Sequence, residues 1–171
     1  MLITETKNLL LMTFTAEAMV SVLSGNKELE FENQIYRFAQ GWPILVYKNL
    51  FPYKISRFQT HPTEEKYEGI IIHKKDRVII GDMGFKGGPD EAGSMEIGYS
   101  IAPCYQGKGY ATEMGSAFCE WGLKQNHVTR ISAICSIYNH ASIRVLEKIG
   151  MIKVKEEIEK YYWMLDKKIN L

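Results

Sequence analysis

The chain lacks an excess of charge, a long hydrophobic run and a signal sequence. Its 21 basic and 20 acidic side chains give a formal net charge of +1, so no overall field attracts nucleic acid or an anionic membrane. Its apolar runs are too short to span a bilayer, and its first residues lack the basic segment and apolar core of a signal peptide. We therefore expect a cytoplasmic protein that binds neither nucleic acid nor membrane. The composition is compatible with a homo-oligomer.

Cysteine is scarce as well. The three copies, Cys104, Cys119 and Cys135, are widely spaced, without a CxxC motif or a histidine pair at ligand spacing. This pattern argues against a disulfide framework and against a zinc site. A nucleophilic role for Cys104 would need a histidine partner, which the sequence does not show. We expect no metal, and we expect buried or unreactive thiols.

Internal repeats, linkers and low-complexity segments are also missing. The 171 residues, of which 46% are hydrophobic and 24% charged, are enough for one domain with its own core. Helical and strand patterns are mixed along the chain, which is typical of an α/β or mixed α+β fold. The sequence therefore predicts one domain over residues 1–171.

The predicted elements follow from periodicity and turn residues. The first part has a strand candidate at 8–14, one or two helices within 15–40 broken at 24–26, and an irregular aromatic-rich stretch at 41–62. Strands follow at 67–73, 78–86 and 94–101, and their short connections predict an antiparallel meander. The last part is predicted to hold a helix up to about 125, a strand at 130–137, a helix at 141–150, and strands at 151–157 and 161–167.

The most informative segment is residues 106–111, Gln-Gly-Lys-Gly-Tyr-Ala, between a predicted strand and a predicted helix. Two glycines let the backbone approach a ligand closely, and the helix behind them offers unpaired N–H groups that favour an anion. A P-loop would need Ser or Thr after Lys108, where Gly109 stands, and a Rossmann fingerprint would need a third small residue. The segment therefore predicts a site for a diphosphate-bearing coenzyme.

These residues resemble the GNAT superfamily of acetyl-CoA-dependent N-acetyltransferases. Residues 106–111 fit its Arg/Gln-x-x-Gly-x-Gly/Ala pattern, and Asn139, residues 147–151 and residues 96–103 are similar to the ribosomal-protein-acetyltransferase-like (RimJ/RimL-type) branch. The resemblance implies a mostly antiparallel central sheet, flanked by helices, in which the fourth and fifth strands, 94–101 and 130–137, splay apart.

The resemblance also implies the coenzyme and its contacts. Acetyl-CoA would bind without metal, with its pantetheine arm hydrogen-bonded along β-strand 94–101 and its diphosphate at the helix N-terminus. The implied coenzyme-binding residues are Tyr99, Ile101, Gln106, Gly107, Lys108, Gly109, Tyr110, Ala111 and Asn139. Lys108 is equally explained as a solubilising charge, and Asn139 as a helix N-cap.

Two residues are candidates for the chemistry. Glu96 lies on the polar face of its strand, where a carboxylate could take a proton from an acceptor ammonium through water, or could simply face solvent. Ser142 could donate a hydrogen bond to the departing sulfur, or could be an ordinary residue of a first helical turn. Many family members have a tyrosine seven residues after the asparagine as general acid, whereas this chain has Leu146.

The implied reaction is direct transfer of acetyl to a primary amine of a small molecule in a ternary complex. The alternatives are acetylation of a protein or peptide N-terminus, and a sensor that binds acyl-CoA without turnover. Eight aromatic residues within 31–58 form either a hydrophobic cap or the wall of an amine pocket. The sequence does not identify the amine or the acyl chain.

Overall fold

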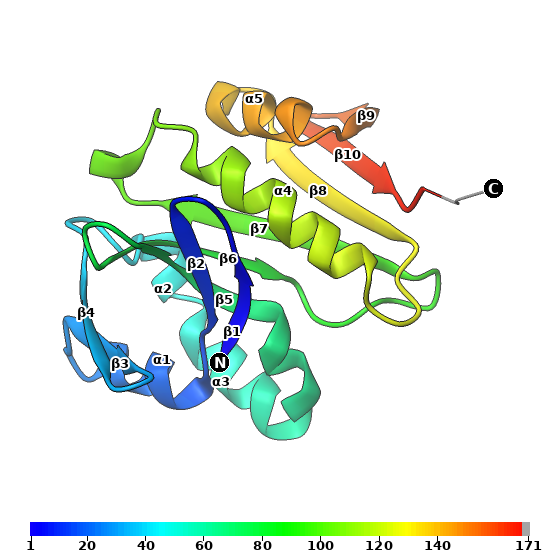
Figure 1. Cartoon of the computed structure of the whole chain (residues 1–171). Coiled ribbons are helices and arrows are strands. Elements are labelled where there is room, and N and C mark those ends of the chain that lie inside the picture. Colours follow the sequence, from blue (N-terminus) through cyan, green and yellow to red (C-terminus); the bar gives the residue numbers. More distant parts are fainter. Residues whose placement is uncertain (169–171) are drawn as a thin grey trace.

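The computed structural model describes residues 1–168 and shows a mixed α/β fold (Figure 1). Its strands are β1 (Leu2–Glu5), β2 (Leu9–Thr13), β3 (Glu28–Phe31), β4 (Gln34–Phe38), β5 (Glu68–His73), β6 (Val78–Phe85), β7 (Ser94–Ile101), β8 (Arg130–Ser136), β9 (Ile152–Glu157) and β10 (Lys160–Asp166). Its helices are α1 (Ala16–Leu23), α2 (Leu45–Lys48), α3 (Phe51–Thr60), α4 (Tyr110–Leu123) and α5 (His140–Lys148), with 3-10 turns at η1 (Pro62–Tyr67) and η2 (Pro103–Tyr105).

The strands form one ten-stranded sheet. Its main path runs β1-β2-β5-β6-β7-β8-β10-β9, and the β3–β4 hairpin joins it through a short parallel contact between β4 and β6. The pairs β1–β2, β2–β5, β5–β6, β6–β7, β8–β10 and β9–β10 are antiparallel, whereas β7 and β8 are parallel. The expected meander over β5, β6 and β7 and the mostly antiparallel sheet are thus confirmed.

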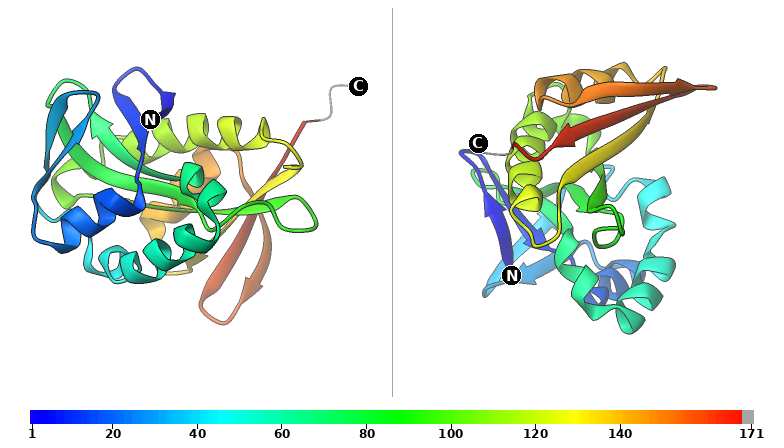
Figure 2. Two further views of the ribbon diagram at one scale, coloured as in Figure 1. Left: turned by 90° about the horizontal axis from the view of Figure 1, so that it is seen from below. Right: turned by 90° about the vertical axis from the view of Figure 1, so that its right-hand side faces the viewer.

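Helices cover the two faces of the central strands separately. α4 lies on one face, while α1 and α3 lie on the other (Figure 2). Beneath α4, Phe85 of β6 stacks on Phe118 with ring centroids 4.3 Å apart, and Trp121 continues the stack. Beneath α3, Phe14 meets the edge of Phe51 at 5.3 Å. Aromatic burial on both faces therefore anchors the helices to the sheet.

Helix boundaries follow local capping chemistry. Thr15 accepts a hydrogen bond from Ala18 N and starts α1, and Asn139 accepts one from Ser142 N and starts α5. α5 stops just before Gly150, whose φ of +89° suits glycine at the end of a helix. These caps place the predicted helical segments near their expected positions.

The N-terminal third departs from the prediction. Helix formation within 15–40 stops at Leu23, and the remainder forms the β3–β4 hairpin instead. The hairpin turns at Glu32 and Asn33, whose φ values of 52° and 63° match a tight two-residue turn. The stretch 41–62 is also not irregular, because it contains α2 and α3. The structure adds β1, for which no strand was predicted.

Candidate active site

β7 and β8 pair over only part of their length. The last pair in their parallel register joins Glu96 to Ser132. Beyond it β7 continues to Ile101 and β8 continues to Ser136, without further pairing between the two strands. This confirms the splay expected between these strands, and it opens a gap in the middle of the sheet.

The backbone of β7 offers hydrogen-bonding groups to this gap. At the two ends of the β6–β7 pair, Glu96 O accepts a hydrogen bond from Lys86 N, and Ala102 N donates one to Ile80 O. Because antiparallel strands bond through alternate residues, the odd-numbered residues Tyr99 and Ile101 turn their backbone groups towards the gap. Ile101 O accepts a hydrogen bond of 2.8 Å from Gln106 Nε2, which holds the following loop against the strand. A pantetheine amide would find a free strand edge at Tyr99.

The loop after β7 leads directly into α4. Gly107 and Gly109 have φ values of +73° and +84°, and Gly109 is the N-cap of α4. A Cβ placed on either glycine would have no heavy atom within 4 Å, so the space above the helix N-terminus is open. Positive φ and open space together make this terminus accessible to a phosphate.

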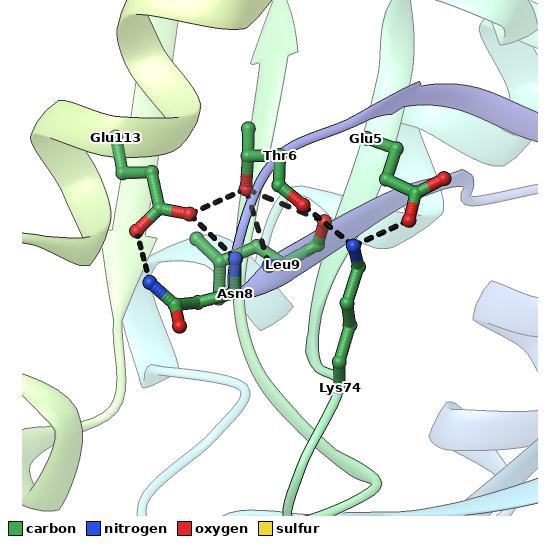
Figure 3. A network of polar contacts seen from close by, with 6 residues as sticks. All are labelled: Glu5, Thr6, Asn8, Leu9, Lys74 and Glu113. Carbon is green, nitrogen blue, oxygen red and sulfur yellow. Dashed lines mark hydrogen bonds and ion pairs between the residues drawn. The ribbon is translucent and has the colours of Figure 1, made fainter.

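The start of α4 is tied to the N-terminal hairpin (Figure 3). Glu113, in the first turn of α4, accepts hydrogen bonds from Thr6 Oγ1 at 2.6 Å, Asn8 N at 2.8 Å and Asn8 Nδ2 at 2.9 Å. Burial pushes the pKa of Glu113 upward, but these hydrogen bonds together hold it below its usual range. Lys74 Nζ also donates to Thr6 O at 2.5 Å, and the same ammonium pairs with Glu5. The hairpin therefore fixes the helix that presents the glycine loop.

A cavity of about 520 Å³ joins these elements. From the loop and α4, the predicted residues Gln106, Gly107, Gly109, Tyr110 and Ala111 line it. From β7 and the start of α5, the predicted residues Tyr99, Ile101, Asn139 and Ser142 line it as well. The structure thus brings together most of the candidate set in one hollow.

Two cationic residues that the sequence analysis missed also line the cavity. Arg144 and Lys148 stand four residues apart on α5, on the face shared with Ala141. Among residues 1–168, no acidic side chain lines this cavity. The hollow is therefore electrostatically suited to an anionic ligand. The helix was predicted at 141–150, but which of its side chains face the cavity depends on how α5 is rotated against the sheet.

Three candidate side chains lie elsewhere or have other partners. Lys108 does not line the cavity, and its Nζ lies 5.0 Å from the ring centroid of Tyr105. Glu96 stands at the closed end of the gap and forms an ion pair with Lys86, outside the cavity lining. Asn139 serves as the N-cap of α5, with Oδ1 3.1 Å from Ser142 N. Leu146 is buried, as its apolar helix face predicts.

The Tyr99 hydroxyl is the unusual group of the cavity. It is closed off from water and has no hydrogen-bond partner of good geometry within residues 1–168. Burial raises the pKa of Tyr99 to about 12, against the opposing influence of the nearby Ser142 hydroxyl. Buried polar atoms without partners are rare in folded proteins, so this hydroxyl beside the cavity needs an explanation.

A second polar cluster lies on the opposite face of the sheet, under α2 and α3. Glu68 accepts hydrogen bonds from Tyr47 Oη at 2.6 Å and Lys54 Nζ at 2.5 Å. Asp82 accepts from Trp42 Nε1 at 2.8 Å and from the Ser100 hydroxyl. We call these six residues the cap network.

Burial dominates the electrostatics of the cap network. It raises the pKa of Asp82 to about 7, although the hydrogen bonds from Ser100 and Trp42 lower it. Burial, followed by the charges of Glu68 and Asp82, raises the pKa of Tyr47 well above its ordinary value. Tyr47 is therefore a permanent hydrogen-bond donor. The aromatic residues Trp42, Tyr47 and Phe51 are buried here, so they form a packed cap.

Comparison with known proteins decides the family. The sequence profile of the acetyltransferase (GNAT) domain matches residues 16–152. The chain belongs to the GNAT acetyltransferase family. It is 33% identical over 124 residues to the uncharacterized N-acetyltransferase YjdG of Bacillus subtilis, which covers 72% of this chain and 74% of YjdG. It is also 48% identical over 81 residues to the uncharacterized N-acetyltransferase YnaD of the same organism, over 47% of each chain.

Solved structures show the same GNAT fold. A GNAT-family acetyltransferase from Bacillus anthracis superposes with a TM-score of 0.66 at 22% identity, over 97% of this chain and 98% of that chain. The ribosomal L7/L12 α-N-protein acetyltransferase RimL, solved with coenzyme A, superposes with a TM-score of 0.67 at 14% identity, over 97% and 98% of the two chains. The structural neighbours of this GNAT protein thus include the RimJ/RimL type.

The GNAT cavity fits the coenzyme that the family uses. Family membership makes this chain an acetyl-CoA-dependent N-acetyltransferase. The open α4 N-terminus and the Arg144 and Lys148 side chains suit phosphates, the free edge of β7 suits amides, and Tyr99 has a hydroxyl without a partner. Within residues 1–168, no group of three metal-binding side chains is found, and no helix is long and apolar enough to cross a membrane.

Proposed function

We infer that this GNAT protein transfers an acetyl group from acetyl-CoA directly to a primary amine of a small molecule, in a ternary complex. The observation that carries the proposal is the continuity of the cavity. It joins the accessible α4 N-terminus, the unpaired edge of β7 and the first turn of α5 in one hollow of about 520 Å³. When bound there, acetyl-CoA supplies a thioester whose carbonyl carbon is open to attack by an amine.

The residues of the chain contribute mainly binding and orientation. Gly107 and Gly109 expose backbone amides for the diphosphate, while Arg144 and Lys148 neutralise phosphate charge. Tyr99 and Ile101 align the pantetheine arm along β7, and Asn139 sets the start of α5 beside it. Holding two reactants in the right geometry accounts for much of the acceleration of such a transfer.

Glu96 is the proposed acceptor of the ammonium proton. It lies on β7 at the last residue pair before the strands part, so it stands at the closed end of the gap. Its ion pair with Lys86 keeps the carboxylate on the polar face of the sheet. A water molecule would relay the proton, because Glu96 does not line the cavity itself.

The Glu96 role predicts a kinetic signature. Glu96→Gln keeps the shape of the side chain but removes the proton acceptor, so turnover at neutral pH should fall about tenfold or more, with affinity for acetyl-CoA unchanged. The rate should recover partly at higher pH as free amine accumulates. Lys86→Gln is the matched control, because it breaks the same ion pair and leaves the carboxylate. An equal pH profile in wild type and Glu96→Gln would assign Glu96 to a structural ion pair.

The whole proposal is tested by calorimetry with acetyl-CoA and by thiol release with a panel of amines. Fold neighbours carry names that refer to ribosomal proteins and to spermidine, so the panel includes polyamines, other small primary amines and peptides with free N-termini. We expect tight binding and faster thiol release with small amines. Release with peptides alone would assign the protein to N-terminal acetylation. Binding without release would support the sensor alternative, and no binding would overturn the proposal.

A further inference from the structure

Position 146 holds a leucine where many family members have the tyrosine that serves the departing sulfur, and another tyrosine, Tyr99 of β7, lines the cavity. Leu146 is 1% exposed and packs in the core. On the facing strand, Tyr99 lines the cavity, and its Oη is buried without a partner. Leu146 does not line the cavity, whereas Tyr99 does, so of these two positions only Tyr99 borders the hollow.

The position of the Tyr99 side chain follows from the register of the sheet. Tyr99 pairs with Met83 of β6, and Met83 approaches Gly115 of α4, so both side chains lie on the α4 face. Ser142 at the start of α5 and Tyr110 at the start of α4 line the same cavity as Tyr99. The side chain thus lies on the α4 face of β7, beside the cavity that these elements border.

We propose that the Tyr99 hydroxyl donates the hydrogen bond that stabilises the departing sulfur, in place of a residue at position 146. This inference rests on the proposed function. In the step, a bond forms between the amine nitrogen and the acetyl carbon, and the carbon–sulfur bond breaks with its electron pair going to sulfur. The nitrogen releases its proton to Glu96 or water, and the sulfur leaves as a thiol after taking a proton from solvent. Tyr99 keeps its own proton.

One chemical argument favours Tyr99 over Ser142 as this donor. Neither hydroxyl ionises at neutral pH, and a phenol is a stronger hydrogen-bond donor than an aliphatic alcohol. The Ser142 backbone N–H donates to Asn139 Oδ1, and Ser142 lines the same cavity as Tyr99.

The test compares the affinities of coenzyme A and of desulfo-coenzyme A, which lacks the sulfur, by calorimetry. We expect wild type to prefer coenzyme A, and Tyr99→Phe to reduce this preference about fivefold, as the loss of one hydrogen bond predicts. Affinity for desulfo-coenzyme A should not change. In thiol-release assays, Tyr99→Phe should lower kcat about tenfold or more at unchanged KM for acetyl-CoA.

Two further variants make the result decisive. Tyr36→Phe removes a hydroxyl from another buried tyrosine, bonded to Gln34 in the β3–β4 hairpin, and should leave both readouts unchanged. Ser142→Ala tests the competing donor. An unchanged sulfur preference and kcat in Tyr99→Phe would overturn the inference, and losses confined to Ser142→Ala would assign the role to Ser142. If wild type binds neither ligand, the proposed function itself fails.

Discussion

The cap network and the cavity lie on the two sides of β7 and treat buried polar groups in opposite ways. In the cap network, Glu68 and Asp82 each accept hydrogen bonds from two side chains. In the cavity, the Tyr99 hydroxyl has no partner within residues 1–168, and Gly109 faces open space. Satisfied polar groups stabilise and orient packed elements, whereas unsatisfied groups beside a hollow are available to a ligand. We therefore interpret the polar groups of the cap network as structural and the Tyr99 hydroxyl as a candidate ligand contact.

Ser100 connects the two regions. Its hydroxyl donates to Asp82 in the cap network, while the residue lines the cavity. The side chains of its two neighbours in β7, Tyr99 and Ile101, point to the other face of the sheet. One strand therefore carries a structural polar contact on one face and the proposed coenzyme contacts on the other.

The largest effect should come from breaking the ion pair of the cap network. Lys54→Met leaves the buried Glu68 carboxylate with only Tyr47 as donor, so the free energy of unfolding should fall by about 3 kcal/mol. Urea denaturation measures this. Lys124→Met, which breaks an exposed pair with Glu120 on α4, is the matched control and should have no measurable effect. Equal small effects in both variants would show that the cap network does not stabilise the fold.

The next effect concerns Asp82 and pH. The pKa of Asp82 is about 7 in the folded chain and about 3.9 in an unfolded chain, so the folded state holds the proton more tightly. The stabilisation from this proton is complete below about pH 4 and is lost as pH rises through 7. Between pH 5 and 8, wild type should lose about 2.5 kcal/mol relative to Asp82→Asn.

The measurement for Asp82 is the free energy of unfolding of both proteins at several pH values. Asparagine keeps an oxygen for Trp42 and Ser100 but does not titrate in this range. The difference in the free energy of unfolding between the two proteins should therefore vary with pH and not stay at one constant value. A constant difference from pH 5 to 8 would mean that Asp82 ionises normally inside the cap network.

The glycine loop should show a smaller effect, seen in binding. Gly109→Val places a branched side chain at the N-terminus of α4, so affinity for acetyl-CoA should fall about tenfold or more. Valine at a φ of +84° also strains the backbone by about 1–2 kcal/mol. Gly25→Val is the matched control, because Gly25 has a φ of +97° and open space but lies after α1. Similar affinities in both variants would remove the loop from the site.

The predictability of the two regions differs for a physical reason. From residue 67 onward, alternating apolar residues and short turns located each strand within a few residues, and the loop motif located the start of α4. The β3–β4 hairpin was missed because its turn uses Glu32 and Asn33 in left-handed conformations without glycine. The alternation of apolar and polar residues in these short strands is also partly compatible with the periodicity of a helix.

Within the site, local motifs were predictable and packing was not. The loop residues follow from the spacing of Gly107 and Gly109, and the cap role of Asn139 from its place before a helix. The cavity contacts of Arg144 and Lys148 depend on how α5 is rotated, which only tertiary contacts decide. The partnerless Tyr99 hydroxyl depends likewise on what surrounds it, and no sequence pattern records that.

The smallest expected effect is on stability, and it compares the removal of one tyrosine hydroxyl from each of the two regions. Tyr47→Phe removes a hydroxyl that donates to Glu68, so the free energy of unfolding should fall by about 1 kcal/mol. Tyr99→Phe removes a buried hydroxyl that has no partner, so stability should stay unchanged or rise slightly, because no hydrogen bond is lost and a desolvated polar atom disappears. Thermal unfolding of the two variants without coenzyme measures both. A loss in Tyr99→Phe as large as that in Tyr47→Phe would mean that Tyr99 is already bonded inside the protein, and its hydroxyl would then not be free for a ligand.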